Sequence, residues 1–297
     1  MLALAATTPA IMPPVFPVQA GLLTVRRLGH GDEAEVLAFL AVRPIHTVIM
    51  AGMIRDNGLV SSRNRGAFYG CRDAAGRLEG VALIGHVTMV ETHSDVALQL
   101  FAELAQTYHY GHVILGEHDK VERFWASYGT GGQSPRLMCR ELLFEQRCPV
   151  EVLEPVDLRL ATRDDIEKII PVHARMAFEE CGIDPIEKDA IGFRRRVAHR
   201  IDMGRIWVWT DLEKLVFKAD VASDTPEQIY LEGIYTNPEE RGKGFGRRAI
   251  SQLSRTLLAR TRSLCALVNE KNREAHLFYQ RAGYKLRGYY DTIYLQQ

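Results

Sequence analysis

The chain has 297 residues, and its 37 Lys and Arg side chains balance its 37 Asp and Glu side chains, so the formal net charge is zero. A neutral chain has no global field to recruit nucleic acid or a membrane surface, and no apolar run reaches the roughly 18 residues of a membrane span. The five cysteines are scattered without a Cys-x-x-Cys pair, which argues against a disulfide framework or zinc site and fits a reducing cytosol. We therefore expect a cytoplasmic protein without a metal, nucleic-acid or membrane partner, and the length favours two domains.

The N-terminal half begins with a proline-rich stretch and then shows regular apolar patterns. Residues 1–20 contain four prolines and no Lys or Arg, so we expect a flexible leader and no signal peptide. Over the first expected domain, residues 21–148, the patterns predict strands at 23–28, 67–72, 78–90, 113–115 and 138–144 and helices at 33–41, 47–54, 95–106 and 119–128. Residues 149–155 contain two prolines and no helical period, so they predict a linker.

The C-terminal half, residues 156–297, repeats the same order of elements. The patterns predict strands at 158–161, 205–210, 214–222, 229–236, 264–268 and 286–295 and helices at 162–180, 189–203, 247–259 and 272–282. Short sequence anchors repeat as well, because 112–115 with 124–129 parallels 266–269 with 278–283. The repeat predicts a tandem of two like domains.

A glycine-rich loop follows the strand at 229–236. Asn237-Pro238 ends the strand, and Arg241-Gly242-Lys243-Gly244-Phe245-Gly246 leads into the next helix. Glycines let a backbone approach a ligand closely, and a helix N-terminus offers free N–H groups and a favourable dipole to an anion. The loop and the helix start carry four cationic side chains, Arg241, Lys243, Arg247 and Arg248. This stretch predicts a pyrophosphate site.

Three families of glycine loop compete for this sequence. A P-loop needs Gly-Lys-Ser/Thr at its end, and the dinucleotide fingerprint needs Gly-x-Gly-x-x-Gly after the first strand, so neither fits. The third pattern, Arg/Gln-x-x-Gly-x-Gly/Ala, is matched by Arg241, Gly244 and Gly246 and resembles motif A of the GNAT superfamily of N-acetyltransferases. A second segment resembles another motif of that family, Asn-x-x-Ala-x-x-x-Tyr-x-x-x-Gly-Phe/Tyr, through Asn272, Ala275, Tyr279, Gly283 and Tyr284.

The resemblance implies an α/β (α+β) fold of two tandem GNAT-like domains, each with a mixed, mostly antiparallel sheet flanked by helices, as in bacterial two-domain members. It implies direct transfer of an acetyl group from acetyl-CoA to a primary amine. In the family, the strand before the loop splays from its neighbour, and the pantetheine arm lies in the gap. By position, the residues that would hold acetyl-CoA are Ile234, Tyr235 and Thr236 by their main chain, Arg241, Gly242, Lys243, Gly244, Phe245, Gly246 and Arg247 around the pyrophosphate, and Asn272, which would bind pantetheine or cap its own helix.

Two side chains are candidates for the proton transfers. An alkylamine must lose a proton before it attacks, and a carboxylate can take that proton directly or through water. Glu232 is the provisional base, since strand alternation would place it on one face with Ile234 and Thr236. Asp220 on the adjacent strand is the reserve. Tyr279 matches the family's position for a general acid that protonates the departing thiolate.

The N-terminal half departs from the family where the chemistry would be. Glu91-Thr92-His93-Ser94-Asp95 replaces the glycine loop, and Trp125 replaces the acid, which predicts a degenerate GNAT domain. The clustered histidines have no metal-site spacing. Arg194–Arg196 with His199 and Arg200 predict a charged, solvated helix face, with an acidic partner or the 3′-phosphate of the nucleotide as the alternative.

The acceptor and the acyl group stay open. Glu179, Glu180 and Asp184 would favour a cationic amine if they face the acceptor cleft, and the amine could belong to a small molecule or a peptide. Transfer of another acyl group and a non-catalytic acetyl-CoA sensor or assembly module are the alternatives. The sequence does not fix the oligomeric state.

Overall fold

The computed structural model describes residues 18–20, 22–151 and 154–296. Most of the expected leader at 1–20 and two positions of the expected linker therefore lie outside the described residues. In the described part, the helices are all too short or too polar to cross a membrane.

The chain forms two compact units. The N-terminal unit runs up to Leu143 and also takes in the end of the chain from Gly288, whereas the C-terminal unit is Phe144–Arg287. The predicted domains differ from these units at the C-terminus. The physical reason is strand pairing, because Tyr290–Tyr294 pairs antiparallel with residues 113–117 of the N-terminal unit.

The elements of the N-terminal unit follow the predicted order. They are β1 (Val18–Ala20), β2 (Leu23–Arg27), α1 (Glu33–Leu40), α2 (Pro44–Asn57), β3 (Gly66–Arg72), β4 (Leu78–Gly85), β5 (Val87–Thr92), α3 (Asp95–Gln106), β6 (Val113–Glu117), α4 (His118–Tyr128) and β7 (Pro135–Gln146), whose end from Phe144 belongs to the C-terminal unit. The strands lie in the order β1-β2-β3-β4-β5-β6, followed by β13 (Lys285–Leu295) from the end of the chain.

One predicted strand of this unit is wrong. The expected single strand at 78–90 is two antiparallel strands, β4 and β5, that reverse direction at His86. The reversal depends on close backbone contact, since a Cβ at Gly85 would lie 2.3 Å from the Cα of Gly66. The His86 N–H donates to the Arg65 carbonyl at 2.8 Å and holds the turn in place.

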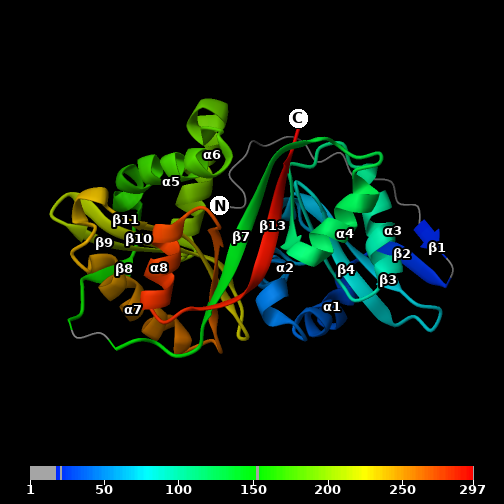
Figure 1. Cartoon of the computed structure of the whole chain (residues 1–297), viewed down its shortest axis with the longest axis horizontal. Helices are drawn as coiled ribbons and strands as arrows, with labels where there is room; N and C mark the ends of the chain where they lie inside the picture. Colours follow the sequence, from blue (N-terminus) through cyan, green and yellow to red (C-terminus); the bar gives the residue numbers. More distant parts are fainter. Residues whose placement is uncertain (1–17, 21, 152–153, 297) are drawn as a thin grey trace. The chain divides into compact units, whose positions relative to one another are not determined.

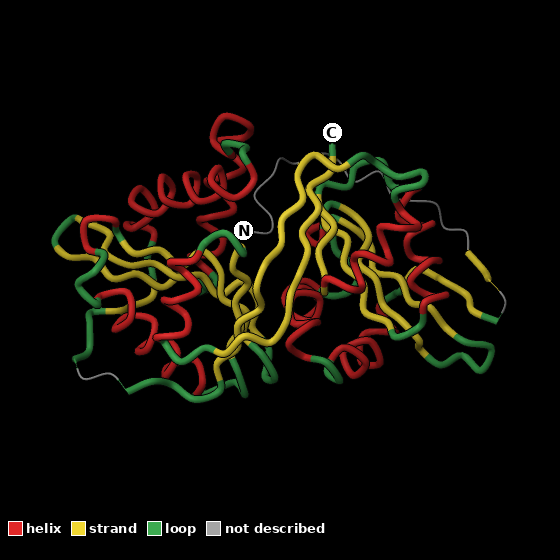
Figure 2. The backbone as a smooth tube through the Cα atoms, in the orientation of Figure 1, coloured by secondary structure: helices red, strands yellow, loops and turns green. Residues whose placement is uncertain are grey.

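The C-terminal unit repeats the same sequence of elements. They are β8 (Leu158–Leu160), α5 (Ile166–Cys181), α6 (Pro185–Asp202), β9 (Ile206–Asp211), β10 (Lys214–Asp224), β11 (Ile229–Thr236), α7 (Phe245–Leu258), β12 (Leu264–Asn269) and α8 (Arg273–Arg281). Here the strands lie in the order β12-β11-β10-β9-β8. The shared order of elements confirms the repeat seen in the sequence, and Figure 2 shows strands flanked by helices in each unit.

In each unit the described strands form antiparallel ladders together with a parallel pair. The parallel pairs are β5 with β6 in one unit and β11 with β12 in the other. In the C-terminal unit, α5 and α6 cover one face of the sheet and α7 and α8 the other (Figure 1). Ile169, Phe193 and Val208 are fully buried in the core between α5, α6 and the sheet. The expected fold class is thus confirmed.

Candidate active site

Strands β11 and β12 separate soon after they begin. Their described ladder holds two residue pairs, Ile229 with Leu264 and Tyr230 with Cys265. Strand β11 then continues to Thr236 and leads into the glycine loop and α7. The splay expected for this strand is therefore present. Beyond these two described pairs, the main-chain groups of β11 that point toward β12 are not paired with it.

Strand β11 contains a bulge at Gly233. On β10 the step from Lys218 to Asp220 is two residues, whereas their partners Tyr235 and Glu232 are three residues apart. Gly233 absorbs the extra residue with φ +59°, a left-handed conformation that glycine adopts easily. The bulge interrupts the alternation of side chains along the strand.

The predicted facing of Glu232 is therefore wrong. Glu232 shares a face with Tyr235, not with Thr236, because the bulge adds one residue between them. Tyr235 packs in the core beneath α5 and α6, and Glu232 pairs with Arg200 of α6. Thr236 lies toward α7 on the other face, since a Cβ at Gly246 would meet its Oγ1 at 2.5 Å.

Glu232 is a buried, ion-paired carboxylate. Its Oε1 accepts a hydrogen bond from Arg200 Nη1 at 2.7 Å, and its Oε2 is buried without a hydrogen-bond partner among the described residues. Burial alone would raise the pKa of Glu232, but the Arg200 guanidinium outweighs it and holds the pKa below the usual range. Arg200 was expected to be solvated on a charged helix face, and the inward ion pair corrects that expectation.

Beside Glu232 lies a cluster with almost no access to solvent. His173, Lys218 and Asp220 are each 0 % exposed. Lys218 Nζ lies 2.7 Å from Asp220 Oδ1, and His173 Nε2 lies 3.0 Å from Asp220 Oδ2. Burial would raise the pKa of Asp220, yet the charge of Lys218 and the contact with His173 lower it, so Asp220 is ionised. Burial lowers the pKa of His173, which makes it neutral at physiological pH.

The glycine loop has the geometry of an anion site. Gly242 and Gly244 have φ values of +76° and +83°, and a Cβ at either position would meet no atom within 4 Å. Helix α7 starts at Phe245 directly after Gly244, and no side chain caps its N-terminus. The first amides of α7 are thus left for an external acceptor. The loop residues present fit a pyrophosphate group.

The cationic side chains around this loop differ in how free they are to contact a bound anion. Arg241 is exposed, and its Nε donates to the Thr236 carbonyl at 3.3 Å. Lys243 pairs with Glu240 at 2.8 Å, and Arg247 is exposed. Arg248 turns away and donates from Nε to the Glu154 carbonyl at 3.1 Å. The ring of Phe245 packs edge-on against Trp209. The main chain of Phe245 is therefore the part of this residue that can contact a ligand in the loop.

Helix α8 supplies the remaining predicted residues. The Asn272 side chain accepts from the Ala275 N–H at 3.0 Å and caps the helix, one of its two expected roles. Tyr279 is 6 % exposed, stacks on Phe144 and meets Tyr284 edge-on. Burial raises the pKa of Tyr279 well above the usual value, so its hydroxyl keeps its proton at neutral pH. A protonated phenol suits a proton donor.

In the corresponding parallel strand pair of the N-terminal unit, β5 with β6, strand β5 is followed by a helix whose N-terminus is capped. Strands β5 and β6 are also paired over two described pairs, Val87 with Val113 and Thr88 with Ile114. Ser94 then caps α3 by accepting from the Ala97 N–H at 3.2 Å, so this helix N-terminus already has a side-chain acceptor.

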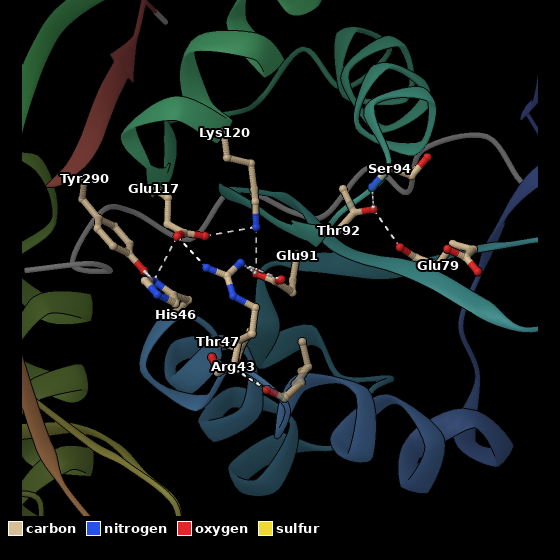
Figure 3. A network of polar contacts seen from close by, with 11 residues as sticks. Arg43, His46, Thr47, Glu79, Glu91, Thr92, Ser94, Glu117, Lys120 and Tyr290 are labelled. Atoms are coloured by element: carbon tan, nitrogen blue, oxygen red, sulfur yellow. Dashed lines mark hydrogen bonds and ion pairs between the residues drawn. The ribbon is translucent and has the colours of Figure 1, made fainter. Parts of the chain in front are cut away.

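Charged side chains of the N-terminal unit converge on this junction (Figure 3). Lys120 Nζ lies 2.8 Å from Glu91 Oε2 and 3.2 Å from Glu117 Oε2. Arg43 bridges the same two carboxylates at 3.0 Å and 2.6 Å. Two cations and two anions thus neutralise one another here. Residues 91–95 stand in place of a glycine loop, and Glu91 is buried within this network.

Sequence reasoning missed several of these groups. It did not identify His173, Lys218 or Arg200 as neighbours of Glu232, nor the network around Lys120. A signal for the bulge itself was available, because a glycine inside a strand pattern is typical of a bulge. In the described part of the chain, no cluster of three or more His, Cys, Asp or Glu side chains could hold a metal ion.

The chain is similar to one protein family in sequence and to several solved structures in fold. Residues 224–293 match the family model described as FR47-like protein, which spans β11 to β13. Curated protein sequences give no match. Among solved structures, a GNAT-family acetyltransferase from Colwellia psychrerythraea is similar at 11 % identity and a TM-score of 0.58, over 92 % of this chain and 99 % of that one.

Two further structures are similar over comparable lengths. A Drosophila protein shares 12 % identity with a TM-score of 0.66, over 92 % of this chain and 98 % of its own. A tandem GNAT protein from the clavulanic acid biosynthesis pathway shares 13 % identity with a TM-score of 0.56, over 93 % of this chain and 99 % of its own. At such identities the likeness establishes the fold. The chain therefore shares the fold of these GNAT structures, and its residues 224–293 resemble the FR47-like family.

Proposed function

We propose that the C-terminal unit is an acetyl-CoA-dependent N-acetyltransferase that moves an acetyl group to a primary amine. The observation that carries the proposal is the combination of a splayed β11–β12 junction with an uncapped helix N-terminus behind a glycine loop. A CoA thioester needs both features, an anion site for its pyrophosphate and main-chain partners for its pantetheine amides. Acetyl-CoA would supply an acyl group activated as a thioester.

The residues around the loop would bind the nucleotide end. The amides of Gly244, Phe245 and Gly246 at the start of α7 would donate to the pyrophosphate, with Arg241 and Arg247 adding positive charge. The main chain of Ile234, Tyr235 and Thr236 would bind the pantetheine arm and polarise the thioester carbonyl. Backbone dipoles fixed in this way stabilise developing negative charge without reorganisation.

Two buried side chains would handle the protons. Glu232 is ionised, and its unpartnered Oε2 can accept the amine proton directly or through water. Tyr279 is protonated and can donate to the departing thiolate sulfur. Because Glu232 faces α6 whereas Thr236 faces α7, we infer that the amine enters from the α5–α6 side of the sheet. The acceptor would be a small-molecule or peptide amine.

Calorimetry with acetyl-CoA tests the proposal. Wild-type protein should bind acetyl-CoA, and Gly244→Glu should abolish binding, because the substitution strains a residue at φ +83° and puts a carboxylate in the anion site. Gly76→Glu is the matched control, since Gly76 also has a positive φ of +81° with open space around it but lies in the β3–β4 turn.

The control variant should bind acetyl-CoA as the wild type does. No binding by the wild type would overturn the proposal. Binding without turnover on a broad panel of amines would favour an acetyl-CoA sensor, and turnover with propionyl- or succinyl-CoA in preference to acetyl-CoA would correct the acyl group.

A further inference from the structure

Lys218 is a fully buried cation that contacts the bulge of β11. Its side chain is 0 % exposed. Its ammonium donates to the Gly233 carbonyl at 2.9 Å and to Asp220 Oδ1 at 2.7 Å. Lys218 therefore joins the bulge to the buried carboxylate of its own strand.

Stability alone is a poor reason for such a pair. A buried ion pair must overcome the desolvation of both charges, and well-packed apolar residues of similar size are often equally stable or better. Burial lowers the pKa of Lys218, because a buried ammonium group loses its hydration. Buried pairs of this kind are best attested where they fix one geometry among several.

The geometry fixed here is that of Gly233. A Cβ at this position would lie 2.9 Å from Lys218 Nζ and 3.0 Å from Asp220 Oδ2. The ion pair therefore leaves no room for a side chain at residue 233. The bulge sets the direction of the main chain that follows, at Ile234 and Tyr235. The orientation of the Gly233 peptide thus depends on the Lys218 ammonium.

We propose that Lys218 is a positioning residue for the transfer reaction. It holds the Gly233 carbonyl and so aims the following amides of β11 into the gap beside β12, where they polarise the thioester carbonyl. The inference rests on the proposed function. Lys218 does not touch the reacting atoms, and it acts through the peptide that it holds.

The test uses a double variant that removes the pair without leaving a lone charge. Lys218→Met with Asp220→Asn keeps similar side-chain volumes. The probe is acetyl-CoA labelled with ¹³C at the thioester carbonyl, and the readout is the infrared stretch of the bound carbonyl. The matched control is Lys120→Met with Glu91→Gln, which removes another buried Lys–carboxylate pair at 2.8 Å that lies in the N-terminal unit.

In the wild type, the bound carbonyl should stretch at lower frequency than in free acetyl-CoA. The double variant should return the band toward the free value and lower kcat by about 10²-fold with little change in acetyl-CoA affinity, as expected for a misplaced group. The control pair should lose stability but keep the wild-type band and kcat. Faster hydrogen exchange of the Ile234 and Tyr235 amides in the unliganded double variant would support the same conclusion.

Two results would overturn the inference, and they are distinguishable from each other. If the wild type binds and turns over acetyl-CoA but the double variant keeps its band and kcat, Lys218 has no positioning role and the proposed function stands. If the wild type does not bind acetyl-CoA, the proposed function fails first and the inference fails with it.

Discussion

Arg200 Nη1 lies 2.7 Å from Glu232 Oε1, and this contact determines the charge state of the carboxylate at the bulge. Glu232 is ionised because of the guanidinium, despite its burial. An ionised carboxylate is ready to accept a proton, although its low pKa makes it a weak base. Arg200 therefore tunes the residue proposed to act on the amine.

Arg200→Met should both destabilise the protein and shift its pH dependence. Removal of one partner of a buried ion pair typically costs about 3–5 kcal/mol, because the other charge is left without compensation. The pKa of Glu232 should then rise. The acid limb of the kcat/KM profile should move to higher pH, since the base must be ionised to act.

The contribution of Glu232 to the free energy of unfolding should change with pH in opposite directions in this variant and in the wild type. With its folded pKa lowered, Glu232 contributes stability at neutral pH that is lost as the pH falls below the ordinary value of 4.5. In Arg200→Met the folded pKa is raised, so stability should decrease as the pH rises through that value. Urea unfolding across this range measures the effect. Arg194→Met on the same helix is the control, because Arg194 and Glu167 form an exposed pair. An unchanged acid limb in Arg200→Met would show that Glu232 is not the titrating base.

Gly246→Ala should destabilise the C-terminal unit, although alanine normally favours a helix. The new Cβ would lie 2.5 Å from Thr236 Oγ1 and 3.2 Å from the Phe278 ring. Overpacking of this kind costs about 1–3 kcal/mol. Thr236→Ala removes the hydroxyl, so the double variant should recover part of the loss. A double-mutant cycle by denaturant unfolding measures the coupling, and additive single effects would contradict the packing of α7 on β11.

Tyr279→Phe should reduce kcat by about 10²-fold or more and leave acetyl-CoA affinity nearly unchanged, as expected for loss of a general acid. Because the pKa of Tyr279 is raised, its ionisation should not produce the basic limb of the pH–rate profile. Tyr284→Phe is the control. Its hydroxyl hydrogen-bonds to Ser254 Oγ at 3.2 Å, so its loss should cost about 1 kcal/mol of stability with little effect on kcat. Equal effects of the two variants on kcat would argue against the acid role.

Glu117 should make the N-terminal unit acid-sensitive. Burial would raise its pKa, but the hydrogen bond from Arg43 and the neighbouring charges hold the pKa at about 2, against an ordinary value of 4.5. Its contribution is therefore present above pH 4.5 and is lost as the pH falls toward 2. It should amount to the order of 2 kcal/mol after allowance for partial solvent screening. In a plot of the free energy of unfolding against pH, Glu117→Gln should have a smaller slope than the wild type between about pH 2 and 4.5. Equal slopes for the two proteins would contradict the prediction.

The sequence predicted helices and strands well where one apolar period continued without interruption. The strand at 229–236, the glycine loop and the following helix are where the pattern placed them. The errors arose where a single residue changes the path of the chain. His86 reverses a strand that reads as continuous, and Gly233 inserts a residue that reverses the facing of Glu232.

Partners far apart in the sequence were the other limit. Nothing in the local pattern distinguishes Arg200, which turns inward to Glu232, from Arg194, which pairs with Glu167 on the surface. His173, Lys218 and Asp220 come together only when α5 and β10 pack against each other. Periodicity describes one element at a time, so a cluster drawn from several elements is not visible in it.

The pairing of Tyr290–Tyr294 with β6 has a consequence for biosynthesis. A ribosome makes the N-terminal half first, yet the sheet of that half lacks its β13 strand until residues 285–295 have been translated. The edge of β6 is then exposed for most of the time that the chain is being made, and unpaired strand edges promote aggregation. Nascent chains stalled before residue 288 should bind chaperones through this edge and be released when β13 is added.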